Sequence, residues 1–211
     1  RSNPLLVKRL LHSVRNDKRT KSVFLIKNSR RCIVMKIHNN IVLIGMPGSG
    51  KTSLGSIIAE RLELDFYDID QYIQEKENKT ISELFLLGES HFRQIESNAV
   101  REVSSKKPIV IATGGGVVTR PENIAVLQQK GTIFYIDRPI EMIIETIDVA
   151  ARPLLADNVK RIYSLYEQRK HLYEGHCHYR ITNGLSLHCA ADQILKVFVK
   201  SQDSEQLAIS D

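Results

Sequence analysis

The sequence predicts a three-layer α/β/α domain built around a parallel β-sheet. Short apolar runs alternate with helical patterns along most of the 211 residues. Strands that alternate with helices form parallel sheets with helices on both faces. A glycine-rich stretch, residues 45–52, directly follows the first predicted strand of this alternation. Ligands of such folds gather beyond the carboxyl ends of the strands, which is where this stretch would lie.

Length and cysteine content set broad limits on the protein. A chain of 211 residues suits one α/β domain, and a domain of this size buries a core without disulfides. The three cysteines, Cys32, Cys177 and Cys189, are widely spaced and odd in number. This pattern favours a reducing compartment and argues against a disulfide framework or a structural zinc site. No apolar run approaches the ~20 residues of a membrane span, so we expect no membrane partner.

The net charge of +6 comes from one end of the chain. Residues 1–38 hold eleven lysines and arginines and a single acid, Asp17, so the remainder is mildly acidic. Because such a body offers no basic surface to a nucleic acid, we expect no nucleic-acid partner.

The basic segment has three interpretations. We favour Met35 as the natural start, because it lies six residues before the first predicted strand. The others are an organellar transit peptide, typically Arg-rich and acid-poor, and an arm for nucleic acid or a membrane surface. We therefore expect residues 1–34 to be a disordered or non-native extension, 35–201 a single domain, and 202–211 a tail. The expected location is the cytoplasm, or an organellar stroma or matrix if 1–34 is a native transit peptide.

Five apolar runs predict five strands. The runs at 41–44 and 108–112 are unbroken, which is typical of buried strands in a parallel sheet. The other three are short and lie between helical patterns. In chain order, the predicted strands cover residues 41–44, 64–67, 108–112, 132–136 and 179–182.

Helical patterns occupy the intervals between the strands. Thr80 and Glu83 have the spacing of a capping box, which predicts the start of a short helix. The other predicted helices cover residues 53–62, 89–104, 121–129, 140–146, 158–173 and 190–200.

The glycine-rich stretch matches the phosphate-loop pattern G-x-x-x-x-G-K-[ST] at every fixed position, from Gly45 to Thr52. Glycines let the backbone curl so that its N–H groups cradle an anion, and the following helix adds positive charge from its N-terminus. In this pattern Lys51 reaches the β- and γ-phosphates and the Thr52 hydroxyl binds Mg²⁺. The alternative is a glycine-rich turn with a surface lysine. The predicted nucleotide-binding residues are Gly48, Ser49, Gly50, Lys51, Thr52 and Ser53.

Five further features narrow the substrate. They are Asp68-Ile69-Asp70, Gly88-Glu89-x-x-Phe92-Arg93-x-x-Glu96, Gly114-Gly115-Gly116-Val117-Val118, Ala151-Arg152-Pro153-Leu154-Leu155 and Arg169-x-x-Leu172-Tyr173. Together with the phosphate loop, their order and spacing resemble the shikimate kinase family over roughly residues 35–195. The resemblance implies a P-loop NTPase fold with a five-stranded parallel sheet in the order 2-3-1-4-5 and a mobile lid.

The resemblance also implies an activity. The expected reaction is transfer of the γ-phosphoryl of ATP to the 3-hydroxyl of shikimate, giving shikimate 3-phosphate and ADP, in aromatic amino-acid biosynthesis. The implied partners are ATP, shikimate and one Mg²⁺ ion bound with ATP, and we expect a monomer. Three alternatives stay open: a P-loop kinase for gluconate or a nucleoside monophosphate, a non-catalytic shikimate-kinase-like protein, and a nucleic-acid-binding protein that uses the basic arm.

Two carboxylates follow the second predicted strand. In Asp68-Ile69-Asp70, alternate residues point the same way, so the two carboxylates can serve neighbouring ligands. The resemblance implies that Asp68 helps to hold Mg²⁺ through water. It implies that Asp70 hydrogen-bonds the acceptor hydroxyl and acts as a catalytic base. The alternative is a pair of aspartates that cap the next helix.

Two arginines are candidates for holding the substrate carboxylate. Arg93 and Arg169 offer planar forks suited to bidentate capture of a carboxylate, and shikimate carries one. The alternative for Arg93 is a salt bridge to Glu89 or Glu96, which lie within one helical turn. The alternative for Arg169 is a solvated helix face.

The glycine run and the lid arginine complete the predicted site. Gly114, Gly115 and Gly116 would let the backbone approach the substrate, unless they form only a strand-to-helix turn. Arg152 precedes Pro153, which keeps its backbone out of the helical region. The resemblance implies that Arg152 lies over the γ-phosphate and acts in catalysis with Lys51 and Asp70. The alternative for Arg152 is a surface loop position.

The chain departs from the family on the adenine side. Residues 141–151 contain no Lys or Arg before Arg152, where the family usually carries a lid arginine. Residues 183–185, after the fifth predicted strand, contain no cation either. We hypothesise that an apolar lid residue, Ile147 or Val149, covers the base instead.

Overall fold

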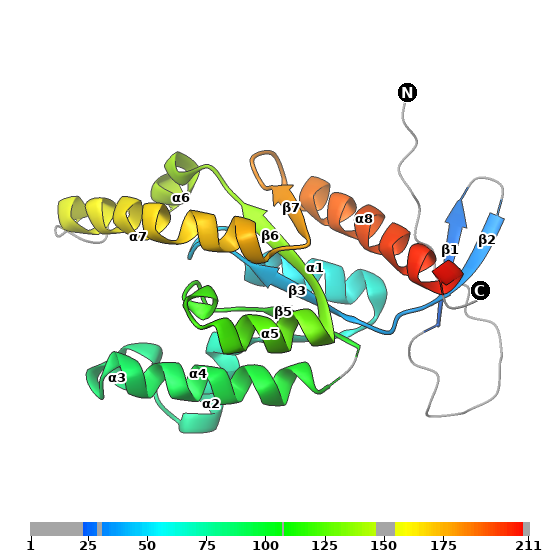
Figure 1. Ribbon diagram of the computed structural model, residues 1–211. Helices are drawn as coiled ribbons and strands as arrows, with labels where there is room; N and C mark the ends of the chain where they lie inside the picture. The colour runs from blue at the N-terminus through cyan, green and yellow to red at the C-terminus, as the bar shows by residue number, and fades with distance from the viewer. Residues whose placement is uncertain (1–22, 29–30, 107, 147–154, 209–211) are drawn as a thin grey trace.

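The computed structural model describes residues 23–28, 31–106, 108–146 and 155–208 (Figure 1). The predicted lid segment that leads into Arg152, with Ile147 and Val149, lies outside the described residues. The predictions made for these three residues therefore stay predictions.

The centre of the molecule is a five-stranded parallel sheet. Its strands are β3 (Asn40–Ile44), β4 (Asp65–Asp68), β5 (Ile109–Ala112), β6 (Gly131–Asp137) and β7 (Tyr179–Thr182). They lie in the order β4-β5-β3-β6-β7, and every neighbouring pair is parallel. Counted from β3, this is the predicted order 2-3-1-4-5, so the fold class is confirmed. The carboxyl ends of all five strands meet at one edge.

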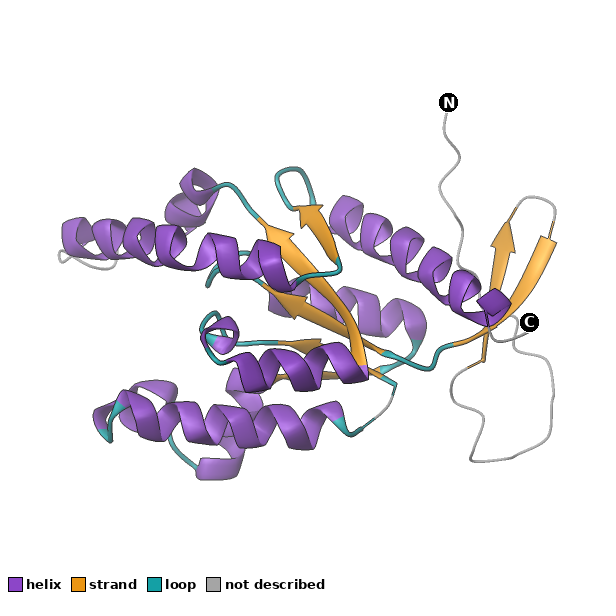
Figure 2. Cartoon of the chain, in the orientation of Figure 1, coloured by secondary structure: helices purple, strands orange, loops and turns teal. Residues whose placement is uncertain are grey.

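Helices cover both faces of this sheet, as Figure 2 shows. Side chains alternate between the faces along β3. Val42 and Ile44 pack with residues of α4, α5 and α7, whereas Ile41 and Leu43 pack with residues of α1 and α8. The helices are α1 (Lys51–Leu62), α2 (Ile69–Glu77), α3 (Ile81–Leu86), α4 (Glu89–Ser104), α5 (Pro121–Lys130), α6 (Ile140–Thr146), α7 (Leu155–His176) and α8 (Leu187–Ala208).

Two helices differ from their predicted form near the phosphate loop. The predicted helix 53–62 begins at Lys51, because Gly50 adopts the left-handed conformation (φ 93°) that ends the loop and serves as N-cap. Lys51 and Thr52 therefore lie in the first turn of α1. No helical pattern was predicted for α2, although the capping alternative for Asp68 and Asp70 implied a helix after them. Its sequence is mostly polar and buries only Ile69 and Ile73, so it lacks a strong apolar period.

A hairpin precedes the domain where no regular structure was expected. Strands β1 (Val23–Asn28) and β2 (Arg31–Lys36) pair antiparallel, with Val23 opposite Lys36. Their β-branched and aromatic residues favour strands, a signal that the high charge of the segment obscured. Because β2 ends just before β3, the hairpin leads into the amino end of the sheet, opposite the phosphate loop.

The final helix also extends beyond its predicted end. Helix α8 runs to Ala208, past residue 201, where the sequence predicted the domain to finish. Residues 201–208 contain no glycine or proline, so nothing stops the helix there. Within the described ranges, no helix is both long enough and apolar enough to cross a lipid bilayer.

Candidate active site

Lys51 is held inside the phosphate loop. Its side chain is buried, and Nζ donates hydrogen bonds to the carbonyls of Gly45 (3.0 Å) and Met46 (2.8 Å). Burial lowers the pKa of Lys51 from 10.5 to about 8, although the carboxylates of Asp70 and Asp68 oppose this shift. At neutral pH the amine is thus mostly protonated. It is bound to the two carbonyls and, at 3.5 Å, to Ser49 Oγ, which are partners that an anion could replace.

Thr52 and Asp68 lie together beside this loop. Thr52 Oγ1 donates to Asp68 Oδ2 at 2.6 Å, while Asp68 Oδ1 accepts from the backbone N–H groups of Asp70 (3.0 Å) and Gln71 (3.3 Å). Asp68 is therefore the N-cap of α2, as the alternative for it stated, and it also lies beside Thr52, while its role toward Mg²⁺ stays a prediction. The two side chains face each other through oxygen atoms, the ligand type that Mg²⁺ prefers. These residues fit the predicted ion.

Asp70 lies at the point where four segments meet. A Cβ at Gly114 would come within 2.6 Å of Asp70 Oδ1 and 3.0 Å of Glu96 Oε1. Burial, and then the charges of Asp68 and Glu96, raise the pKa of Asp70 from 3.8 to about 6 against the opposing charges of Lys51 and Arg93. Asp70 does not cap α2, in contrast to the alternative considered for it.

Arg93 is buried and held from several sides. Nη1 donates to Glu96 Oε2 at 2.8 Å, and Nη2 lies 3.3 Å from Glu89 Oε1. Its Cζ lies 5.3 Å from the centre of the Phe92 ring and 5.7 Å from that of Phe85. Both salt bridges of the alternative considered for Arg93 therefore exist, and they fix its guanidinium.

Arg169 joins this group through Tyr173. The charges of Arg93 and Arg169 both lower the pKa of Glu96, against a larger upward shift from burial. The side chain of Arg169 lies close to Tyr173, and the charges of both arginines lower the pKa of that phenol against a larger upward shift from burial. The two guanidinium groups are thus on the same side of the molecule, within electrostatic reach of one carboxylate.

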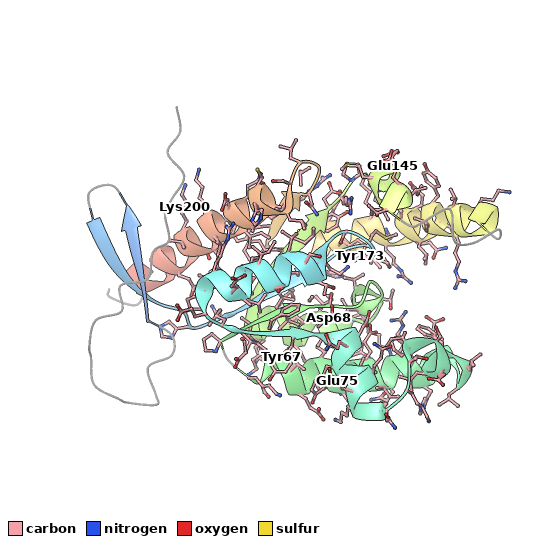
Figure 3. The ribbon with its side chains drawn as sticks, turned by 180° about the vertical axis from the view of Figure 1, so that it is seen from behind. Tyr67, Asp68, Glu75, Glu145, Tyr173 and Lys200 are labelled. Carbon is pink, nitrogen blue, oxygen red and sulfur yellow. The ribbon has the colours of Figure 1, made fainter. Side chains whose placement is uncertain are left out.

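The role of Tyr173 was not predicted, although it ends one of the sequence motifs. Its ring is fully buried, and its hydroxyl donates to the carbonyl of Gly115 at 2.5 Å and lies 3.8 Å from Met46 Sδ. The side chain extends from α7 toward the phosphate-loop end of α1, as Figure 3 shows. Tyr173 therefore links helix α7, the glycine run and the phosphate loop, a contact among distant segments that no local pattern reveals.

Cys177 and His178 directly follow helix α7, and Cys189 lies in α8. His178 Nδ1 accepts a hydrogen bond from the backbone N–H of Ile133 at 2.8 Å. Cys177 and Cys189 are free thiols. Among the residues that the structure describes, no group of three or more His, Cys, Asp or Glu side chains could hold a metal ion.

A phosphate loop at the carboxyl edge of a parallel sheet in this order defines the class of P-loop phosphotransferases. The family model described as "Shikimate kinase" matches residues 47–199. The chain therefore belongs to the shikimate kinase family, and the predicted resemblance is confirmed.

Individual relatives agree with this membership. A shikimate kinase of Clostridium botulinum is 47% identical over 163 residues, which cover 77% of this chain and 99% of the relative. A solved shikimate kinase from Acinetobacter baumannii, in complex with shikimate, has a TM-score of 0.68 at 34% identity and covers 82% of this chain and 93% of its own. A gluconokinase from Sinorhizobium meliloti has a TM-score of 0.57 at only 13% identity, a likeness of fold alone.

Proposed function

We propose that this protein transfers the γ-phosphoryl group of ATP to the 3-hydroxyl of shikimate, giving shikimate 3-phosphate and ADP. One observation carries the proposal beyond family membership. Asp70, Arg93 and Arg169 converge around the buried carboxylate of Glu96, beside the phosphate loop. A base and two guanidinium groups suit an acceptor with hydroxyls and one carboxylate. We further propose that the protein acts as a monomer in the cytoplasm, with one Mg²⁺ ion bound with ATP.

The acceptor would be held by its carboxylate. Arg93 is already fixed by Glu96 and Glu89, so little side-chain entropy is lost when it binds a substrate. Arg169 would supply the second fork from helix α7. The backbone of Gly114, Gly115 and Gly116 would form the floor beneath the ring, since side chains there would collide with Asp70, Pro47 and Arg93.

Asp70 would take the proton of the acceptor hydroxyl. A general base works best when its pKa lies near the operating pH. With a pKa of about 6, Asp70 is mostly ionised at pH 7, yet it binds a proton more readily than an ordinary aspartate. The hydroxyl would then attack the γ-phosphorus while the bridging oxygen leaves with ADP.

The nucleotide would be held by the loop residues Gly48 to Ser53. Lys51 would exchange its carbonyl partners for the β- and γ-phosphate oxygens, and Arg152 is proposed to act from above the γ-phosphate. Thr52, with Asp68 through water, would hold Mg²⁺, which neutralises phosphate charge when it is bound. Catalysis of this kind depends mainly on positioning and charge neutralisation.

The proposal is tested by measuring ADP release with shikimate, with gluconate and with no acceptor, and by identifying the product by mass and phosphorus NMR. We expect release with shikimate only, and phosphate on one ring hydroxyl. Lys51→Met is the control: it should remain folded and lose turnover, because Lys51 is the only cationic side chain of residues 45–52. Equal ADP release with and without shikimate, or near-normal turnover by Lys51→Met, would contradict the proposal.

A further inference from the structure

Two donors from neighbouring strands hold two successive carbonyls of the phosphate loop. Arg138, the residue after β6, donates from Nη1 to the carbonyl of Gly48 at 3.0 Å. Asn183, the residue after β7, donates from Nδ2 to the carbonyl of Ser49 at 2.8 Å. These two residues directly follow Asp137 and Thr182, which are paired in the sheet. Both donors therefore lie side by side at the carboxyl edge of the sheet, although they are far apart in the sequence.

We propose that Arg138 and Asn183 are positioning residues for the nucleotide. Asn183 holds the Ser49 carbonyl outward and so aims the N–H of Gly50 at the phosphates of ATP. Arg138 fixes the preceding peptide, whose N–H, on Ser49, donates to the carbonyl of Met46 at 3.1 Å, and so keeps the loop closed in the shape that presents the Gly50 N–H. This inference rests on the proposed function, because it assigns residues to the nucleotide half of the same site.

The geometry of the peptide bond connects the Ser49 carbonyl to the phosphates. In a trans peptide the C=O and N–H groups point in opposite directions. When Asn183 holds the Ser49 carbonyl from outside, the N–H of Gly50 in the same peptide faces the interior of the loop. Successive N–H groups bind an anion only where they converge. A donor that fixes one peptide plane thus contributes to anion affinity without touching the anion.

Gly50 and Asn183 also fit each other sterically. Gly50 adopts φ 93°, which disfavours other residues, and a Cβ there would come within 2.8 Å of Asn183 Nδ2. Asn183 itself is buried, and its backbone N–H donates to the carbonyl of Asp137 at 2.8 Å. The amide group is therefore anchored before any ligand arrives.

The position of the pair assigns it to the nucleotide. The proposed acceptor residues Asp70 and Gly114–Gly116 follow β4 and β5, whereas Arg138 and Asn183 follow β6 and β7, across β3. The part of ATP beyond its phosphates must extend away from the acceptor, over this second half of the edge.

The charge of Arg138 suits this half of the site. The neighbouring guanidinium of Arg180 is already bound to Asp137, at 2.9 and 2.6 Å. The buried Nε of Arg138, in contrast, has no hydrogen-bond partner among the described residues. Arg138 thus places positive charge beside the phosphate loop. The predicted lid, in contrast, carries no Lys or Arg in residues 141–151.

The test compares Arg138→Met, Arg138→Lys and Asn183→Ala with the intact protein. The matched control is Arg61→Met, which removes a guanidinium from the far end of α1, where it pairs with Asp192. Calorimetry measures the dissociation constant of ADP without an acceptor, the dissociation constant of shikimate, and the melting temperature. We expect ADP binding to weaken about three- to tenfold in Arg138→Met and in Asn183→Ala, the value of one hydrogen bond, with shikimate binding unchanged. Arg138→Lys, which keeps a charged donor, should recover most of the lost affinity.

Three results would overturn the inference: unchanged ADP affinity in both variants, no recovery in Arg138→Lys, or a parallel loss of ADP affinity, shikimate affinity and melting temperature, which indicates general damage to the fold. If the variants behave as expected but the intact protein does not phosphorylate shikimate, the proposed function fails and the positioning roles stand.

Discussion

The guanidinium group of Arg93 lies directly against Gly116. A Cβ at that position would collide with both terminal nitrogens of the arginine. A side chain at 116 would therefore displace a guanidinium that approaches from α4. The glycine run is thus part of the surface that orients Arg93, in addition to being a turn.

Gly116→Ala should therefore damage the use of shikimate. The added methyl group displaces the Arg93 guanidinium, so we expect KM for shikimate to rise about tenfold or more, with KM for ATP unchanged. Gly175→Ala is the control, because a Cβ at Gly175 meets no atom within 4 Å. Steady-state kinetics with each substrate varied in turn separates the two. A Gly116→Ala protein with an unaltered KM for shikimate would refute this role.

Asp70 should give the reaction an acidic limb in its pH profile. The pKa of Asp70 is raised to about 6, and only the ionised form accepts a proton. We expect kcat/KM for shikimate to fall as the pH drops through about 6. If the acidic limb reports proton transfer, it should be absent from substrate binding alone. The control is therefore the dissociation constant of shikimate for the inactive variant Lys51→Met, measured at the same pH values. A flat kcat/KM between about pH 5 and 8 would remove Asp70 from the role of base.

The same carboxylate should lower stability at neutral pH. Because its pKa is raised in the folded state, the protonated form stabilises the fold below the unfolded pKa near 4, and this contribution is lost as the pH rises through about 6. Asp70→Asn should therefore raise the free energy of unfolding, measured in urea at pH 8, by about 1–2 kcal/mol. At pH 4 the variant and the wild type should differ little. An Asp70→Asn protein less stable than wild type at pH 8 is the contrary result.

Tyr173→Phe should separate positioning from packing. The ring of Tyr173 stacks on Tyr135, with centroids 5.2 Å apart, and phenylalanine keeps this contact. Loss of the hydroxyl frees the carbonyl of Gly115 and removes a polar neighbour of Arg169, so KM for shikimate should rise about three- to tenfold with little change in melting temperature. Tyr135→Phe, which loses only a hydroxyl bonded to Asp137 at 3.1 Å, is the control and should leave that KM unchanged. Equal effects of the two variants would assign Tyr173 a structural role only.

Much of the fold follows from local sequence pattern. The five central strands are predicted within one or two residues, because their apolar runs are short and bounded by turns. The capping box of Thr80 and Glu83 is confirmed, with both of its hydrogen bonds present. Helix α2 and the β1–β2 hairpin were missed, because one is nearly all polar and the other lies within a basic segment whose charge dominated its interpretation.

The site was predictable only where a motif marks it. Lys51, Asp70, Arg93 and Arg169 belong to patterns that can be read along the chain, and the structure brings them together. Arg138 and Asn183 belong to no pattern, because each acts on a backbone carbonyl more than 80 residues away in the sequence. Contacts of this kind depend on how strands β6 and β7 align with β3.

The central claim is that paired guanidinium groups recognise the carboxylate of the acceptor. The most direct measurement compares kcat/KM for shikimate with that for its methyl ester, which keeps the three hydroxyls and loses the charge. We expect the wild-type protein to favour the acid about 100-fold or more, and Arg93→Ala to lose most of that preference. Equal kcat/KM for acid and ester in the wild-type protein would contradict the claim.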